Sequence, residues 1–221
     1  MSELQTYKST IISDTVEIAA KTLLSVIPVG GPLISEVWNT VKSNAAQKRL
    51  QEWQQLVEQR LSSMEISLED LGSNQNFASA LFQATEAAIK TAKEEKRCYL
   101  ANALKNSIDC DLDESVMMIF FNMINRYTTL HIKILEFFDN PQKYSNKFRT
   151  NRIMGSPEDV LFDTYPDLIE KREIVHQVYK ELSADGLTNT INFGVTMTAQ
   201  GMHASRTTAL GKQFISFITL N

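Results

Sequence analysis

The sequence predicts a mostly α-helical protein in two parts: an N-terminal helical bundle with a long helical hairpin, then a smaller domain with short strands. Three observations support this fold class. Apolar residues recur every three or four positions over long stretches of the chain. Only 8 Gly and 5 Pro occur among 221 residues, so long helices meet few breakers. From residue 170 onward the pattern changes to a helix, a polar run and a closing helix.

The first two predicted helices form the hairpin. An amphipathic helix over 9–27 ends at a turn rich in Pro and Gly, and a long helix follows over about 33–65. Proline lacks an amide hydrogen and glycine accepts left-handed backbone, so we interpret Gly30 and Gly31 as a hinge. The apolar stretch 11–41 suggests one hypothesis, insertion into a membrane after a rearrangement, although burial in the bundle is favoured.

The apolar stripe of the 33–65 helix is longer than the 9–27 helix can cover. At 1.5 Å per residue the long helix spans about 50 Å and the first helix about 29 Å. A third helical region or a second copy of the chain must cover the surplus, and we favour a homodimer over a monomer. The side chains of this candidate self-association surface are Trp53, Leu56, Val57 and Leu61.

The middle of the chain predicts further helices. A helical region covers about 76–108, and its apolar stripe shifts across the charged residues 93–97, which predicts a kink or two helices. The polar residues 109–113 interrupt the pattern, so we place the domain boundary here, between a helical bundle domain at 1–110 and a second domain at 111–221. The nearly uniform apolar residues 117–124 predict a deeply buried helix in the second domain.

The second domain continues with a helix up to Pro141, loop-like residues to 156, a short helix from Pro157 and a helix over 168–184. A polar run and a closing helix, which begins near Thr207, complete the chain. This order looks like the second half of a winged-helix domain with a small β-wing. A winged-helix-like domain would suit a DNA-binding transcriptional regulator, which is one alternative for the function.

Seven basic residues are candidates for phosphate or nucleic-acid contacts. Residues 143–152 contain four of them, with two aromatic residues and no acidic residue. The predicted helix over 168–184 carries acidic and basic residues in balance, and the net charge is −4, so nucleic-acid binding is disfavoured. The seven candidates are Lys143, Lys147, Arg149, Arg152, Lys171, Arg172 and Arg206.

No motif in the sequence points to catalysis, a cofactor or a metal. A glycine-rich phosphate loop and a nucleophile elbow are missing, and the three histidines have no partners at metal-site spacing. The N-terminus does not read as a signal peptide, and no apolar run approaches the roughly 18 residues of a spanning helix. We therefore expect a cytoplasmic protein that is not an enzyme and takes no cofactor, metal or small-molecule substrate.

Three features of the chain support a family resemblance. The first is the N-terminal apolar segment with Gly31-Pro32-Leu33, which runs into Lys48-Arg49-Leu50. The second is the segment 94–107, and the third is the region 117–141, followed by the residues around Gly186 and by 208–214. Together these features resemble the abortive-infection alpha (Abi-alpha) family of bacterial proteins. The resemblance implies a protein of phage defence or of a mobile element that is not an enzyme.

The pattern and the resemblance together favour one function over two others. We interpret the chain as a non-enzymatic interaction or adaptor protein that acts through protein contacts or oligomerisation, with a role in phage defence. A DNA-binding regulator is the first alternative, and a membrane-perturbing effector that uses residues 11–41 is the second. A protein partner or a second copy is expected, whereas nucleic acid and membrane are disfavoured partners.

Overall fold

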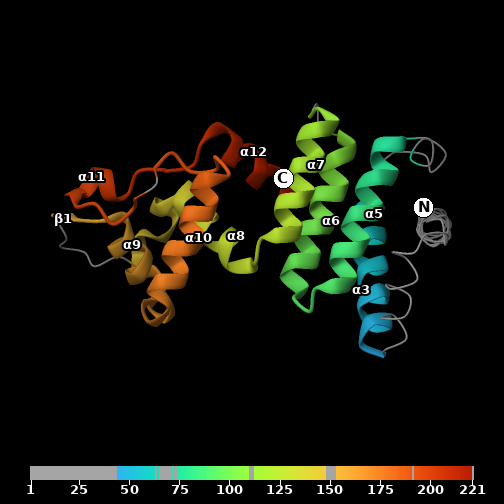
Figure 1. Ribbon diagram of the computed structural model, residues 1–221, viewed down its shortest axis with the longest axis horizontal. Coiled ribbons are helices and arrows are strands. Elements are labelled where there is room, and N and C mark those ends of the chain that lie inside the picture. The colour runs from blue at the N-terminus through green and yellow to red at the C-terminus, as the bar shows by residue number, and fades with distance from the viewer. Residues whose placement is uncertain are drawn as a thin grey trace, which may run out of the picture. The chain divides into compact units, whose positions relative to one another are not determined.

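A computed structural model describes residues 44–62, 64, 71, 74–109, 112–147, 153–190 and 192–220. The predicted hairpin 11–41, with its hinge at Gly30 and Gly31, lies outside the described residues, as do Arg149 and Arg152. The described chain is mostly helical and contains one two-stranded sheet (Figure 1). Its contacts divide it into two compact units, which we call unit 1 (residues 1–126 with 217–220) and unit 2 (residues 127–216 with 221).

Unit 1 is a bundle of helices. Helix α3 packs against α5 and α6, and α7 packs against the same two helices (Figure 1). The predicted region 76–108 is two helices, because Thr91 takes an extended conformation and ends α5. Asn74 caps the start of α5 by accepting a hydrogen bond from the amide of Phe77. The bounds are Asn44–Leu61 for α3, Gln75–Lys90 for α5, Glu94–Asp109 for α6 and Glu114–Arg126 for α7.

The surplus stripe of α3 is packed inside unit 1. Trp53, Val57 and Leu61 are buried, and Leu56 is half-buried. The indole Nε1–H of Trp53 donates a hydrogen bond of 3.0 Å to Thr85 Oγ1 of α5. Because α5 and α6 cover this stripe, its four side chains do not form the exposed apolar patch from which the sequence predicted self-association.

The helix α7 belongs to unit 1, whereas the sequence predicts a boundary at 110/111, before this helix. The rings of Phe120 and Phe121 lie 5.4 and 5.5 Å from the ring of Phe217. Asn106 Nδ2 also donates to the carbonyl oxygens of Phe217 and Thr219. The polar residues 109–113 therefore separate two helices of one bundle, and the contact-based division falls after Arg126.

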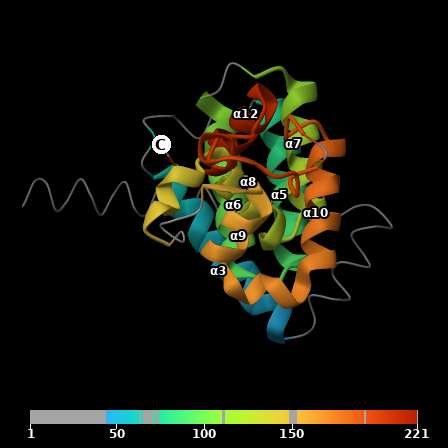
Figure 2. The ribbon, with the colours of Figure 1, turned by 90° about the vertical axis from the view of Figure 1, so that its left-hand side faces the viewer.

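Unit 2 combines helices with the sheet, and α10 packs against α8 (Figure 2). Strand β1 pairs antiparallel with β2, with Met154 opposite Thr198 and Gly155 opposite Met197. A separate bridge joins Thr188 and Thr207. The elements in order are α8 (Thr129–Asp139), η1 (Pro141–Lys147), β1 (Met154–Gly155), α9 (Pro157–Thr164), η2 (Pro166–Lys171), α10 (Arg172–Ala184), β2 (Met197–Thr198), α11 (Ala199–Met202) and α12 (Ala209–Ile218).

Local sequence signals explain two helix ends in unit 2. Ser156 caps α9, because its hydroxyl accepts a bond from the amide of Asp159 while the Asp159 carboxylate accepts one from the amide of Ser156. Gly186 takes a left-handed conformation with φ of 76° just after α10, where the amide of Leu187 donates to the carbonyl oxygen of Leu182. These signals set the start of α9 and the end of α10.

Candidate interaction surface on unit 2

The helix α10 has one buried and one exposed face. Val175, Val178, Tyr179 and Leu182 point into the core of unit 2. The other side chains of the helix are mostly exposed, and Ile174 stands out because its exposed fraction is 54%. We call this exposed side the α10 face, and its described members are Arg172, Glu173, Ile174, His176, Gln177, Lys180 and Glu181.

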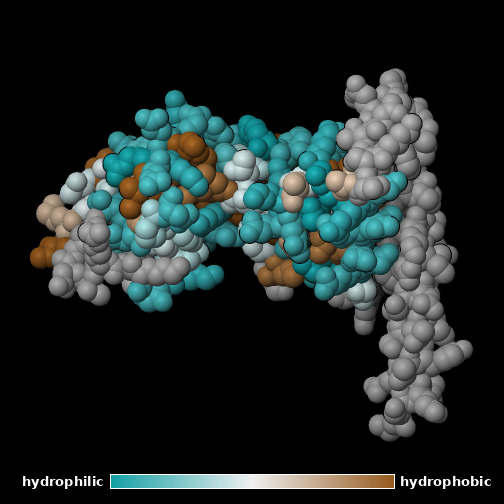
Figure 3. Space-filling view, turned by 90° about the horizontal axis from the view of Figure 1, so that it is seen from below, coloured by the Kyte–Doolittle hydropathy of each residue, from teal (hydrophilic) through white to brown (hydrophobic). Residues whose placement is uncertain are grey.

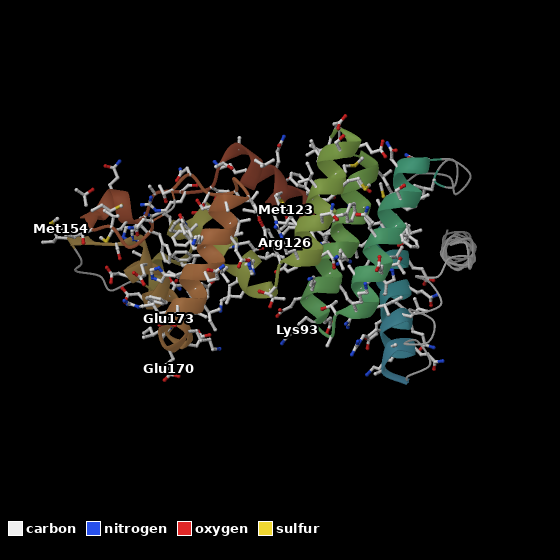
Figure 4. All side chains as sticks on the ribbon, viewed as in Figure 1. Lys93, Met123, Arg126, Met154, Glu170 and Glu173 are labelled. Atoms are coloured by element: carbon white, nitrogen blue, oxygen red, sulfur yellow. The ribbon has the colours of Figure 1, made fainter. Side chains whose placement is uncertain are left out.

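Two open grooves flank the α10 face. The first groove has a volume of about 680 Å³ and is also lined by Asn192 and Phe193. The second has about 400 Å³ and is also lined by Thr128, Leu130 and His131 at the start of α8. Glu173 and Gln177 line both grooves, so they form the ridge between them. Figure 4 labels Glu173 on α10 and Glu170 on the preceding η2.

Two side chains that line the first groove, Arg172 and His176, face a buried carboxylate of α9. Glu158, on α9, is buried, and the exposed fraction of the residue is only 8%. Its Oε1 lies 2.8 Å from His176 Nε2 and 3.3 Å from Arg172 Nε. The guanidinium of Arg172 also lies 5.1 Å from the centre of the Phe162 ring. These contacts join α9 to α10 and partly neutralise the charge of Arg172.

A second polar cluster lies beside the second groove. His131 is 6% exposed, and its Nε2 lies 2.9 Å from Glu181 Oε2 of α10. Its Nδ1 lies 2.9 Å from the hydroxyl of Thr128, and its ring stacks on Tyr127 at 4.9 Å. The Tyr127 hydroxyl in turn donates a hydrogen bond to the carboxylate of Asp185. The cluster ties the start of α8 to the end of α10.

The predicted phosphate contacts lie in different environments. Lys171 and Arg172 are exposed at the start of α10. Lys143 is exposed on η1 near Glu136; burial raises the pKa of Glu136, and the charge of Lys143 opposes that rise. Lys147 ends η1, and its side chain lies outside the described set. The basic candidates therefore do not share one known surface.

Arg206 lies in the interior of unit 2, and it is 7% exposed. Its Nη2 donates to the carbonyl oxygen of Gly201 at 2.7 Å and lies 2.9 Å from the sulfur of Met197. Burial lowers the pKa of its guanidinium, although an arginine stays charged at neutral pH. The sequence predicts that this cation faces a ligand, and the structure corrects that prediction. Arg206 instead contacts β2 and α11, the two elements that precede it in the chain.

Two features of this surface were not predicted from the sequence. Glu158 follows Pro157 at the start of a predicted short helix, and nothing in the sequence indicates that it pairs with two residues of α10. The exposed isoleucines Ile169 and Ile174 were also missed. A signal for Ile174 exists, since it falls off the apolar stripe formed by Val175, Val178 and Leu182.

Within the described ranges, no cluster of three or more His, Cys, Asp or Glu side chains is arranged to hold a metal ion. Nor does any helix in that part of the chain have the length and apolar character needed to cross a bilayer. No protein-family model matches the chain, and no curated protein or solved structure matches it significantly.

Proposed function

We propose that the chain is a non-enzymatic interaction protein that binds a protein partner, or a second copy of itself, through the α10 face. One observation carries this proposal: Ile169 and Ile174 expose 51% and 54% of their surfaces at η2 and α10, and Ile174 lines the second groove. Protein interfaces have an apolar centre within a polar rim, and a partner that covers these isoleucines would bury apolar area now in water.

The charges of the α10 face also favour a protein over a nucleic acid. Arg172 faces the carboxylate of Glu158, and Glu173 lies between the two grooves. A duplex backbone repels such carboxylates, whereas a protein surface can match a mixed pattern of charges. The interior position of Arg206 removes one more cation from the set available to phosphates.

The role in phage defence is supported by the resemblance to the Abi-alpha family. This part of the proposal is tested by phage challenge of bacteria that produce the chain. We expect a lower plaque count with the wild type than with an empty vector. Equal plaque counts would exclude defence against the phages used, and would leave a role of the α10 face in another process to be tested by binding.

A matched pair of variants tests the α10 face. Ile174→Asp places a carboxylate on this face, while Ile119→Asp does the same on α7 of unit 1, where Ile119 is 50% exposed. Both sites are open to solvent, so both variants should fold. We expect the Ile174→Asp variant to lose protection and the Ile119→Asp variant to keep it. Full protection by both would exclude the α10 face as the binding surface.

A DNA-binding regulator is the second candidate, and the order of elements favours it. The series α8, β1, α9, α10, the Thr188–Thr207 bridge and α12 is similar to a winged-helix domain. In such domains the helix at the position of α10 enters the major groove. Retention of duplex DNA at low and at physiological salt tests this function. Sub-micromolar binding at physiological salt, lost in Lys171→Glu, would place the regulator first.

A further inference from the structure

Two charged side chains of the α10 face have no bonding partner among the described residues. Glu173 and Lys180 are exposed, and in that part of the chain neither side chain has an ion pair or a hydrogen bond. The other ionisable side chains of this face, Arg172, His176 and Glu181, are bonded to residues of α9 or α8. Glu173 and Lys180 are therefore the two charges of the α10 face that are available to a partner.

The spacing of these two charges places them on one side of the helix. Seven residues fall about 20° short of two full turns, so Glu173 and Lys180 lie along one line, about 10.5 Å apart. Gln177 lies between them on the ridge between the two grooves. Measured around the helix from Gln177, Glu173 and Lys180 lie about 40° and about 60° to one side, and Ile174 lies about 60° to the other. The ridge thus has a charged side and an apolar side.

A second copy of α10 complements this ridge when the two helices run antiparallel. In an antiparallel pair with two-fold symmetry, each side of one helix faces the same side of the other, and residues equally far from the centre in opposite directions are opposed. Glu173 then faces Lys180 of the other copy, and the symmetry repeats this contact. A parallel pair instead sets the charged side of each helix against the apolar side of the other, and forms neither ion pair.

The charge pattern of the α10 face therefore identifies its partner. We propose that two copies of the chain associate through α10 in the antiparallel arrangement, with Glu173 of each copy opposite Lys180 of the other. This inference rests on the proposed function of the α10 face and names a second copy as what that face binds. Because both copies use the same surface, the contact closes as a dimer and does not extend into a filament.

Ile174 provides the apolar part of the contact. Its exposed fraction is 54%, and Figure 3 shows hydrophobic residues as patches within a mostly hydrophilic described surface. In the antiparallel pair the two Ile174 side chains lie on the same side, about 7.5 Å apart along the helix direction. Exposed ion pairs add little free energy, but like charges that face each other penalise the wrong orientation. Ile174 therefore supports the affinity, while Glu173 and Lys180 set the direction of the pair.

Sedimentation equilibrium of the full chain measures the dissociation constant of the dimer and tests the proposal. Lys180→Glu and Glu173→Lys each place like charges opposite each other twice, so each should raise this constant at least about tenfold. An equimolar mixture of the two variants should recover the wild-type constant, because opposite charges face each other in both pairs of the mixed dimer. The control Lys93→Glu makes the same charge change at an exposed position of unit 1 and should leave the constant unchanged (Figure 4).

Three results would overturn the proposal. A wild-type mass of 25.0 kDa at every concentration would exclude the second copy and leave a different protein as the partner of the α10 face, which the phage challenge of Ile174→Asp tests separately. Equal dissociation constants for the wild type and both charge reversals would place the dimer contact away from Glu173 and Lys180. Reversal variants that are folded by circular dichroism, yet stay monomeric when mixed, would exclude the antiparallel pairing.

Discussion

At the residue scale, Phe120 is the clearest case of a side chain that the core of unit 1 requires. Its ring is fully buried and lies 5.4 Å from the ring of Phe217. The change Phe120→Ala should lower the free energy of unfolding by about 3–5 kcal/mol, since it removes apolar contacts and leaves a cavity. Urea unfolding measures the difference. The neighbouring change Ile119→Ala, at a half-exposed position, should cost much less, and equal costs would contradict this packing.

His203 should make the stability of unit 2 depend on pH. Burial lowers its pKa below the ordinary value of 6.5, because a charged imidazole is poorly solvated there. The unfolded chain therefore takes up a proton before the folded chain as pH falls below 6.5, and stability is lost in that window. Thermal unfolding at about pH 7.5 and about pH 5.5 should show a larger loss for the wild type than for His203→Gln. A larger loss in the variant would reverse the sign and exclude this role.

Single residues also show what the sequence could and could not predict. Trp53 and Phe120 lie on apolar helical stripes, and their burial follows from that spacing. The burial of Arg206 could not be predicted, because its bonding partner is the backbone carbonyl of Gly201, which leaves no trace in the side-chain pattern. The pairing of Glu158 with α10 depends on how two helices pack, which spacing within one helix does not determine.

At the scale of elements, α3 and α5 are joined by one buried polar contact. Trp53 Nε1 donates to Thr85 Oγ1, and both residues are buried. Thr85→Val keeps the shape but removes the acceptor, so the indole N–H stays unpaired at a cost of about 1–3 kcal/mol. The companion change Trp53→Phe should cost less in the Thr85→Val background than in the wild type, since the N–H it removes is no longer bonded there. Additive costs in urea unfolding would exclude the coupling.

The sequence predicted long helices better than short elements. The periodic stripes located α5, α6, α7 and α8 because each has a buried apolar face. The strands β1 and β2 have two residues each, too few for any alternation to be visible. The proline-led turns η1 and η2 were predicted as loop or helix, because a short 3₁₀ turn has no apolar period of its own.

At the scale of the whole molecule, the interruption of the helical sequence pattern does not coincide with the boundary between the two units. The polar residues 109–113 interrupt the helical pattern as strongly as a linker would, yet α7 beyond them packs on α5 and α6. The unit boundary lies between α7 and α8, where only residues 127 and 128 separate the helices. Tertiary contacts, including those made by residues 217–220 to unit 1, decide the division, and they are not encoded in local composition.

The mass of the chain in solution tests how it associates. The predicted stripe of Trp53, Val57 and Leu61 is buried within one chain, so it cannot be a dimer face without unfolding unit 1. A dimer must then use another surface, and we expect the α10 face to provide it. Light scattering at low micromolar concentration should give twice 25.0 kDa for the wild type and for the control variant Ile119→Asp, but 25.0 kDa for Ile174→Asp. A wild-type mass of 25.0 kDa at every concentration would exclude a second copy and leave a different protein as the partner of the α10 face.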